Sequence, residues 1–215
     1  MEKRKIVMIK LRNILEKADD IIYRIEQEIL GFNTTDKKYY SSERRKQGYK
    51  RELARLLPIV KKLGFEKAKE IDKATLKYTA SSYGRTNKAL RADKSSPTAA
   101  LIDQYIEVAP KFKGRELYRG IGKELYQTIV SSKPKTLIDK AFMSSTTYMS
   151  TAEHFARRTG KGGVLILTGA LNKAAQAPQL MAFDDEEGEA EYIFPRNTRM
   201  QIIKIDGEKI FVKVL

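Results

Sequence analysis

Two glutamates near the end of the chain have a spacing that suits chemistry. The stretch "EAEYIFPRNT", residues 189–198, places Glu189 and Glu191 one residue apart at the start of an apolar run. On an extended chain, residues i and i+2 face the same side, roughly 6.5 Å apart along the backbone. The two carboxylates therefore point into one space. Paired carboxylates serve reactions at a sugar carbon, where one stabilises positive charge and the other works as a base.

Two further polar motifs precede the glutamate pair. Arg119 in "LYRGIG" is followed by Gly120, so a bidentate cation stands beside backbone that carries no side chain to obstruct a ligand. A guanidinium suits a pyrophosphate oxygen better than an ammonium does, although a structural salt bridge is the alternative. The hydroxyl cluster Ser144-Ser145-Thr146 comes where a strand should give way to a helix. Turn or capping chemistry is the alternative there.

The order and spacing of these motifs resemble the Arg, Ser-Thr-Ser, Glu-x-Glu class of mono-ADP-ribosyltransferases, and especially the enzymatic components of clostridial binary toxins and related bacterial exoenzymes. The resemblance extends upstream to "YTASSYGRTNKALR", where Tyr83, Asn87 and Arg91 match Tyr, Asn and Arg positions of that class, and it covers residues 75–215. The middle motif departs from the family, because it reads Ser-Ser-Thr. Since the hydroxyls remain, we expect function to survive.

The resemblance implies an enzyme that moves ADP-ribose from NAD to an arginine of a target protein, with release of nicotinamide and without a metal. Glu191 would stabilise the oxocarbenium-like ribose, and Ser144 would hydrogen-bond that carboxylate and fix its rotamer, with Thr146 as a structural partner. Glu189 would orient and deprotonate the acceptor. In this family Glu at that position goes with arginine acceptors, whereas Gln goes with asparagine modification.

The resemblance also implies which residues bind NAD. The arginine of "LYRGIG" would hold the nicotinamide-side phosphate and ribose, and "TAEHFARRTGKGG" stands where the family has a loop that touches phosphate and nicotinamide. Arginines at the end of a helix are also favoured as solvated residues, and this alternative stays open. The candidate NAD-binding residues are Arg119, Gly120, Tyr83, Asn87, Arg91, Phe155, Arg157 and Arg158.

An acidic segment leads into the glutamate pair. Six acidic residues lie within "DDEEGEAE", residues 184–191. They form either a solvated turn or an acceptor-recognition loop, with Met181 and Phe183 as apolar contacts. Crowded like charges should raise the pKa of some of these carboxyls, which would help Glu189 to serve as a base.

Composition limits the classes of function. The 215 residues include no cysteine and one histidine, which excludes disulfides, thiolate nucleophiles, cysteine-ligated zinc and His-rich metal sites. The net charge is +15, with 25 basic and 15 acidic residues up to position 110 and 17 against 12 after it. Solvated helix faces explain this charge, and a surface for nucleic acid or an acidic partner is the alternative. No zinc-finger or RNA-recognition signature supports nucleic acid.

The period of the apolar residues changes along the chain. Helices are predicted at 5–30, 43–63, 65–74, 81–92 and 97–108, the last with Ser96 as cap and Pro97 in its first turn. Strands are predicted at 116–121, 138–146, 162–169, 191–195, 199–205 and 209–214, with helices at 122–131 and 150–158. This favours an α+β fold, which the resemblance makes two small antiparallel-rich sheets around an NAD cleft. We expect a helical lead-in at 1–70 and a catalytic domain at 71–215.

Location and partners follow from the resemblance. Lys10 and Arg12 break the first apolar stretch before it could act as a signal peptide core, and no run has the length of a membrane span. Secretion or delivery into a host cytosol is implied, and a cytoplasmic enzyme stays open. The expected partners are a target protein with an acceptor arginine and a delivery or inhibitor protein. The resemblance suggests actin as the target, and a bacterial or phage-host protein is an equal alternative.

Two other functions stay open at this stage. Hydrolysis of NAD, with water in place of the protein acceptor, needs the same site. A basic adaptor that binds nucleic acid or a partner would use the front helices. A glycan hydrolase is disfavoured, because glycan clefts usually carry exposed Trp and the chain has none.

Overall fold

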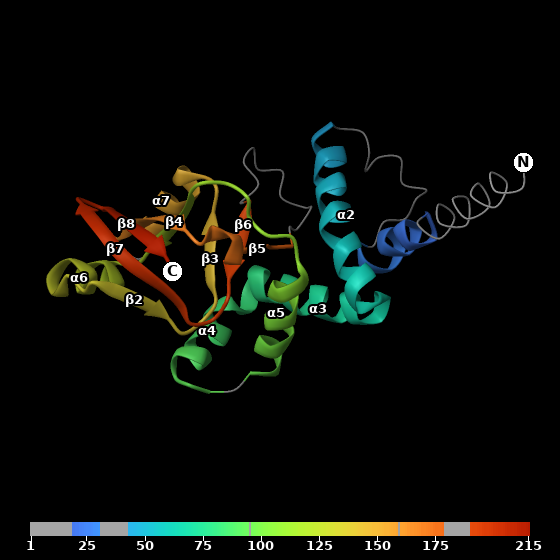
Figure 1. Ribbon diagram of the computed structural model, residues 1–215, viewed down its shortest axis with the longest axis horizontal. Helices are drawn as coiled ribbons and strands as arrows, with labels where there is room; N and C mark the ends of the chain where they lie inside the picture. The colour runs from blue at the N-terminus through green and yellow to red at the C-terminus, as the bar shows by residue number, and fades with distance from the viewer. Residues whose placement is uncertain (1–18, 31–42, 95, 159, 179–189) are drawn as a thin grey trace, which may run out of the picture. The chain divides into compact units, whose positions relative to one another are not determined.

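The computed structural model describes residues 19–30, 43–94, 96–158, 160–178 and 190–215, and Figure 1 shows their helices and strands. The chain divides into two compact units, Met1–Lys69 and Glu70–Leu215. The described part of the first unit is helical, and all the strands found in the described residues belong to the second. Within the described ranges, no helix combines the length and the apolar character needed to cross a membrane.

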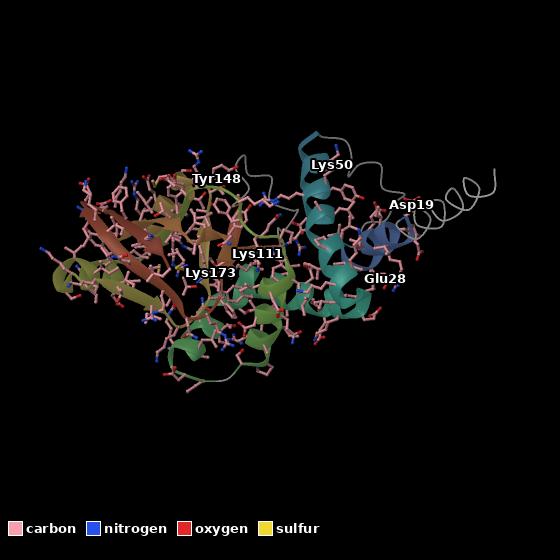
Figure 2. The ribbon with its side chains drawn as sticks, viewed as in Figure 1. Asp19, Glu28, Lys50, Lys111, Tyr148 and Lys173 are labelled. Atoms are coloured by element: carbon pink, nitrogen blue, oxygen red, sulfur yellow. The ribbon has the colours of Figure 1, made fainter. Side chains whose placement is uncertain are left out.

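The first unit contains the π-helix η1 (Ile25–Ile29) and helix α2 (Glu43–Leu63). The bounds predicted for α2 are confirmed, and Gly64 ends the helix in a left-handed conformation with φ of 81°. Its apolar stripe includes Leu56 and Ile59, both fully buried. Glu28, labelled in Figure 2, pairs with Arg24 at 3.2 Å and with Lys69 at 3.5 Å. Of the predicted helix at 5–30, residues 5–18 lie outside the described residues.

A continuous helical path replaces the two helices predicted at 65–74 and 81–92. It consists of α3 (Phe65–Lys77), the π-helix η3 (Tyr78–Ser82) and α4 (Tyr83–Arg91). A π-turn is rare and needs tertiary support. Here Tyr78 supplies it, since the side chain is fully buried and its ring meets that of Phe142 edge-on at 5.7 Å.

Helix α5 (Pro97–Val108) follows the sequence prediction at both ends. Ser96 is the N-cap, and its hydroxyl oxygen accepts a hydrogen bond from the amide of Ala99 at 3.4 Å. Pro97 occupies the first turn, where its missing N–H costs nothing. Tyr105 in this helix is buried and donates from its hydroxyl to the carbonyl oxygen of Gln176 at 2.6 Å.

Eight strands form one mixed sheet in the order β2-β7-β8-β4-β1-β3-β6-β5. Among the strands of the described ranges, only β4 and β8 pair in parallel, so the predicted α+β class with a mostly antiparallel sheet is confirmed. The elements are β1 (Leu117–Ile121), α6 (Lys123–Ser132), β2 (Thr136–Asp139), β3 (Met143–Thr146), α7 (Met149–Arg157), β4 (Gly163–Gly169), η4 (Leu171–Lys173), β5 (Ala175–Gln176), β6 (Glu191–Phe194), β7 (Thr198–Asp206) and β8 (Lys209–Val214).

The expected division into two sheets survives only as a weak junction inside this single sheet. Strands β1 and β3 pair at Tyr118↔Thr146, whereas β1 and β4 pair from Leu117↔Leu167 to Ile121↔Gly163. An unpaired strand edge leaves backbone N–H and C=O groups without partners. Pairing between β1 and β3 satisfies part of both edges, and it joins the two sets of strands into one sheet.

The strand predicted at 138–146 is wrong as a single element. Strand β2 pairs with β7, and β3 pairs with β6, so the two halves belong to different parts of the sheet. The chain bends between them, where Asp139 Oδ1 accepts a hydrogen bond from the amide of Ala141 at 3.0 Å. This is the local turn chemistry of Asp, which competes with strand formation. The two-residue strand β5 is a further element that the sequence pattern does not predict.

The two faces of β1 and β4 have different neighbours. Leu117, Ile121 and Leu165 belong to the main apolar core. On the other face, Val164 packs with Ala152 and Ala156 of α7, and Figure 1 shows α7 beside β4. Alternation along the strands therefore turns Arg119 and Gly120 in opposite directions.

Candidate active site

Arg119 lies on β1 with its guanidinium between a hydrogen-bonded carbonyl and a carboxylate at ion-pair distance. Nη1 donates a hydrogen bond to the carbonyl oxygen of Ser144 at 2.6 Å, and Nη2 lies 3.8 Å from Asp139 Oδ2. The side chain is 19% exposed. Burial lowers the pKa of Arg119, and the charge of Asp139 raises it again. A guanidinium stays protonated under these conditions, so the site contains a fixed positive charge.

Ser144 and Glu191 lie on the paired strands β3 and β6. Thr146 stands opposite Glu191, and Ser144 stands opposite Ile193. In an antiparallel pair, these positions share one face, and the diagonal neighbours Ser144 and Glu191 are within reach of each other. The charge of Glu191 increases the rise in the pKa of Tyr78 and opposes the fall in the pKa of Arg119. Three of the four motif residues therefore converge.

Tyr78 is a member of this cluster that the sequence motifs do not reveal. Burial raises its pKa to about 12, a rise that the hydrogen bond from Asn87 opposes and the charge of Glu191 increases. The charge of Arg119 and the hydrogen bond with Ser144 also oppose the rise. Asn87 Nδ2 donates to the Tyr78 hydroxyl at 3.0 Å and to the carbonyl oxygen of Phe142 at 3.2 Å. The sequence does offer one signal for Tyr78, which is a second tyrosine five residues before Tyr83. The predicted helices end at residue 74 and resume at residue 81, so Tyr78 is predicted to lie between them, whereas the π-turn directs its side chain to the strands.

The three predicted residues of α4 differ in their surroundings. Asn87 is buried and links the helix to the backbone just before β3. Arg91 donates to both carboxylate oxygens of Asp139, from Nε at 3.1 Å and from Nη2 at 2.9 Å. Tyr83 is 49% exposed. Asp139 is a second residue that the sequence does not single out, because a continuous strand is predicted through this position.

The three hydroxyls of the middle motif have different contacts. Ser145 is buried and donates to the carbonyl oxygen of Tyr192 at 3.2 Å. Thr146 Oγ1 accepts from the amide of Tyr148 at 3.1 Å, immediately before α7. Ser144 is half-buried, and its side chain is a hydrogen-bond partner of the Tyr78 hydroxyl that lowers the pKa of Tyr78. The Ser144 hydroxyl therefore faces the cluster around Tyr78.

Gly120 is required by packing against a helix. A Cβ at this position would lie 2.2 Å from the carbonyl oxygen of Ala152 and 2.7 Å from the amide nitrogen of Ala156. The space beside Gly120 is therefore filled by the backbone of α7. The sequence predicts that this space admits a ligand, and the close approach of α7 is instead the physical reason for glycine here.

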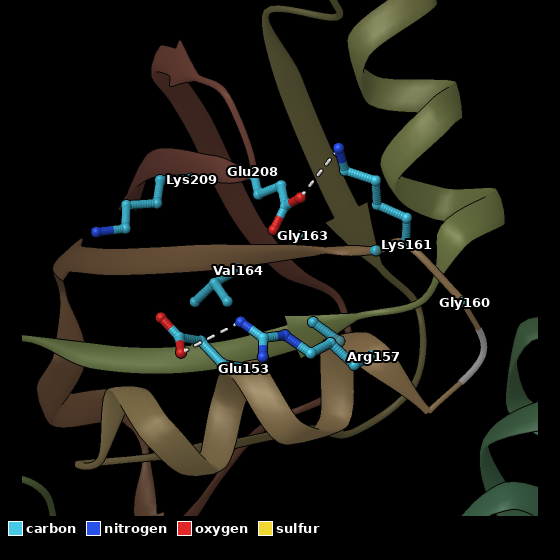
Figure 3. A pocket seen from close by; sticks show the side chains of 10 residues that line it. Glu153, Arg157, Gly160, Lys161, Gly163, Val164, Glu208 and Lys209 are labelled. Carbon is cyan, nitrogen blue, oxygen red and sulfur yellow. Dashed lines mark ion pairs between the residues drawn. The ribbon is translucent and has the colours of Figure 1, made fainter.

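The arginines at the end of α7 lie apart from Arg119. Arg157 pairs with Glu153 at 3.8 Å, and Lys161 pairs with Glu208 at 3.4 Å. These residues line a pocket of about 390 Å³ that Val164 also borders (Figure 3). Val164 stands opposite Gly120 in the ladder, so this pocket lies on the α7 face of the sheet.

Arg158 has a different neighbour. Its guanidinium carbon lies 5.6 Å from the centre of the Phe155 ring, which is partly exposed. The structure thus pairs these two candidates with each other and does not bring them into the cluster around Arg119. Glu189 and the acidic segment with Asp184–Glu187, Met181 and Phe183 lie outside the described residues. Among the described residues, no group of three or more His, Asp or Glu side chains could hold a metal ion.

Known proteins share this fold. The Vis toxin, an ADP-ribosyltransferase from Vibrio splendidus, is 15% identical over 87% of this chain and 89% of that chain, with a TM-score of 0.55. HopU1 of Pseudomonas syringae pv. tomato DC3000 is 16% identical over 83% and 85%, with a TM-score of 0.52. C3larvin from Paenibacillus larvae is 15% identical over 68% and 94%, with a TM-score of 0.51. No curated protein matches this sequence.

The sequence also matches a family model described as ADP-ribosyltransferase exoenzyme, over residues 45–213. The matched range includes Arg119, Ser144 and Glu191 and spans most of the chain. This protein therefore belongs to the ADP-ribosyltransferase exoenzyme family.

Proposed function

We propose that this enzyme transfers ADP-ribose from NAD to the guanidinium of an arginine side chain in a target protein and releases nicotinamide. The observation that carries the proposal is the convergence of Arg119, Ser144 and Glu191 from β1, β3 and β6. All three belong to the unit Glu70–Leu215, which supports a catalytic domain at 71–215. The N-terminal residues 1–70 are then the lead-in.

The carboxylate of Glu191 suits the breaking of the bond between nicotinamide and ribose. The bonding electron pair moves to the ring nitrogen, so nicotinamide leaves as a neutral molecule and positive charge develops on the ribose. A carboxylate beneath the ribose stabilises this charge, and the Ser144 hydroxyl orients the carboxylate. A nitrogen of the acceptor guanidinium then bonds to the ribose carbon and gives up its proton to Glu189.

Arg119 suits the phosphate side of NAD. Its guanidinium is held by Ser144 and Asp139 and is partly buried, so its attraction for a phosphate is screened less by water than that of a surface lysine. NAD carries two negative charges on its pyrophosphate, and the fixed cation Arg119 can pair with them. The carboxylate of Glu191 lies in the same cluster and would face the ribose. NAD is therefore the proposed substrate.

The choice of arginine as the acceptor rests on Glu189, which lies two residues before Glu191. A carboxylate pair matches a guanidinium in charge and shape. A solved structure of Vis, 16% identical to this chain with a TM-score of 0.56, is a complex with agmatine. Agmatine carries the same guanidinium group as arginine, so this observation on Vis supports the proposal for the present enzyme.

The natural target is proposed to be a protein of a host cell that the enzyme reaches by secretion or delivery. Actin is one candidate acceptor, and a bacterial or phage-host protein is the other. A delivery or inhibitor protein that binds the helices of residues 1–70 belongs to the same proposal.

The test uses NAD labelled on its adenine portion, with agmatine and a mixed cell lysate as acceptors. Wild-type protein, Glu189→Gln and Glu191→Gln are compared, with Glu124→Gln, an exposed residue of α6, as the matched control. We expect wild type and Glu124→Gln to label agmatine and lysate proteins. Glu191→Gln should lose both labelling and nicotinamide release, by about 100-fold or more. Glu189→Gln should lose labelling and keep nicotinamide release.

Two results would contradict the proposal in different ways. Nicotinamide release without label on any acceptor would identify an NAD glycohydrolase, in which water takes the place of the protein. A folded wild-type protein that neither binds NAD nor releases nicotinamide would not be an ADP-ribosyltransferase, and the basic adaptor would then be the better hypothesis.

A further inference from the structure

Asp139 connects two arginines that lie far apart in the sequence. Its carboxylate forms a two-point contact with Arg91 of α4, and Oδ2 lies 3.8 Å from Nη2 of Arg119 on β1. We propose that Asp139 is a positioning residue of the NAD site: Arg91 orients its carboxylate, and the carboxylate holds Arg119 in the position that binds NAD. This inference rests on the proposed function, and it makes Arg91 act through Asp139.

The contacts of Asp139 leave its carboxylate little freedom. Oδ1 accepts from Arg91 Nε at 3.1 Å and from the amide of Ala141 at 3.0 Å, while Oδ2 accepts from Arg91 Nη2 at 2.9 Å. A fork-to-fork pair of this kind sets the plane of the carboxylate as well as its distance. The side chain of Asp139 is 14% exposed, so water screens its charge only partly.

Arg119 is held on two sides by the bend between β2 and β3. Asp139 is the last residue of β2, before the bend, and it faces Nη2. Ser144 lies on β3, after the bend, and its carbonyl oxygen accepts from Nη1. The residues on both sides of the bend therefore contact the guanidinium of Arg119. Without the carboxylate, Arg119 would keep the Ser144 carbonyl as a partner, but its positive charge would lie beside that of Arg91 with no Asp139 charge to offset the repulsion. Such repulsion is costly for a partly buried cation.

The charge balance agrees with a positioning role. Two guanidinium groups share one carboxylate, so the three side chains keep a net charge of +1 for an anionic ligand. Arg91 donates two of its five N–H groups to Asp139, and both lie on the edge of the guanidinium that faces the carboxylate. Arg91 itself is 47% exposed.

The test compares Asp139→Asn with Asp93→Asn as a matched control. Asp93 follows α4 and pairs with Lys140 at 2.7 Å, so this ion pair joins the same two segments of the chain but does not involve Arg119. Asparagine tolerates the left-handed conformation of Asp93, whose φ is 55°. Steady-state nicotinamide release gives KM for NAD and kcat, and calorimetric titration with NAD gives binding directly.

We expect Asp139→Asn to raise KM for NAD about tenfold or more and to weaken the titrated binding equally, with kcat within about threefold of wild type, because a held Arg119 binds NAD before and during the reaction. Asp93→Asn should leave KM unchanged. Because the proposed residues act as one unit, the effects of the substitutions should not multiply. Asp139→Asn combined with Arg119→Lys or with Arg91→Gln should have a KM less than about threefold above that of the single variant Arg119→Lys or Arg91→Gln.

Several outcomes would overturn this inference while leaving the proposed function intact. They are an unchanged KM in Asp139→Asn, a lower melting temperature as its only effect, the same rise in KM in Asp93→Asn, and full additivity of the double variants. Full additivity with Arg91→Gln alone would mean that Arg91 contacts NAD independently of Asp139. A wild-type protein that neither binds NAD nor releases nicotinamide would overturn the proposed function together with this inference.

Discussion

Arg119 on β1 donates a hydrogen bond of 2.6 Å to the backbone carbonyl oxygen of Ser144 on β3. The bond crosses the junction at which β1 and β3 pair only at Tyr118↔Thr146. It therefore fixes the cation relative to the strand that carries the hydroxyl motif. Because the acceptor is a backbone atom, changes to the Ser144 side chain leave this bond in place.

Replacement of Arg119 by lysine should impair NAD binding although the charge is kept. An ammonium lacks the two terminal nitrogens with which the guanidinium donates to the Ser144 carbonyl and faces the Asp139 carboxylate. We expect KM for NAD in nicotinamide release to rise about 100-fold. Arg115→Lys, an exposed position before β1, is the control and should match wild type. Equal KM values for Arg119→Lys and wild type would show that the fork geometry is unimportant.

Ser144 and Ser145 should respond differently to alanine. Ser144→Ala removes the hydroxyl that faces Tyr78, so we expect nicotinamide release to fall about tenfold or more while the melting temperature stays near that of wild type. Ser145→Ala removes a buried hydrogen bond to Tyr192, so we expect a loss of about 1 kcal/mol in the free energy of unfolding with little change in kcat. Denaturant unfolding and steady-state kinetics measure the two effects. The reverse pattern would place the functional hydroxyl at Ser145.

Alanine at Gly120 should separate β1 from α7. The new Cβ would lie 2.2 Å from the carbonyl oxygen of Ala152, which is helix backbone and cannot rotate away. Denaturant unfolding should show a loss of about 1–3 kcal/mol in the free energy of unfolding. Gly84→Ala is the matched control, since Gly84 lies in α4 and a Cβ at this position would meet nothing within 4 Å. That variant should be stabilised by about 0.5–1 kcal/mol. Equal stability of the two variants would contradict the close approach of α7.

Tyr78 should make the protein less stable at high pH. Its pKa of about 12 lies above the ordinary value of 10.0, chiefly because burial disfavours the phenolate. The raised pKa of Tyr78 stabilises the folded protein fully below pH 10, and this stabilisation is lost as the pH rises from 10 to 12. The reason is that the Tyr78 hydroxyl loses its proton at a lower pH in the unfolded chain than in the folded one. Two pH units correspond to about 3 kcal/mol.

The measurement for Tyr78 is urea unfolding of wild type and Tyr78→Phe between pH 8 and about 11. Phenylalanine loses the contact with Asn87 and should be less stable at pH 8, but its stability should fall less steeply above pH 10. The difference between the two curves isolates Tyr78 from the other tyrosines and lysines. Parallel curves over the whole range would mean that Tyr78 titrates normally.

Local signals in the sequence are enough to predict most of the elements. Gly64 after α2 and Ser96 with Pro97 before α5 act on the backbone of their own turns, so the bounds of these helices could be predicted. The strands β4 and β8 are dense apolar runs, and their prediction is confirmed within a residue at each end. The family motifs also point to Arg119, Ser144 and Glu191, because their order along the chain is itself a sequence property.

The partners of those residues depend on contacts between distant segments. Tyr78 reaches the cluster only because its burial against Phe142 supports a π-turn that helix propensity disfavours. Asp139 is hidden in the sequence because the run 138–146, with Asp139 and Lys140 as its only charges, still has the pattern of a strand, whereas the Asp139 carboxylate accepts a hydrogen bond from the amide of Ala141 where the chain bends.

The sequence by itself therefore determined the family and the main helices and strands, and it predicts the residues of the chemical motif, because these depend on residue type and local spacing. Tertiary structure decided how the strands join into one sheet, why Gly120 must be glycine, and how Arg91, Asp139 and Arg119 meet. The physical reason is that these features depend on the burial of side chains and backbone groups between segments as far apart as residues 91 and 139, for which no local pattern exists.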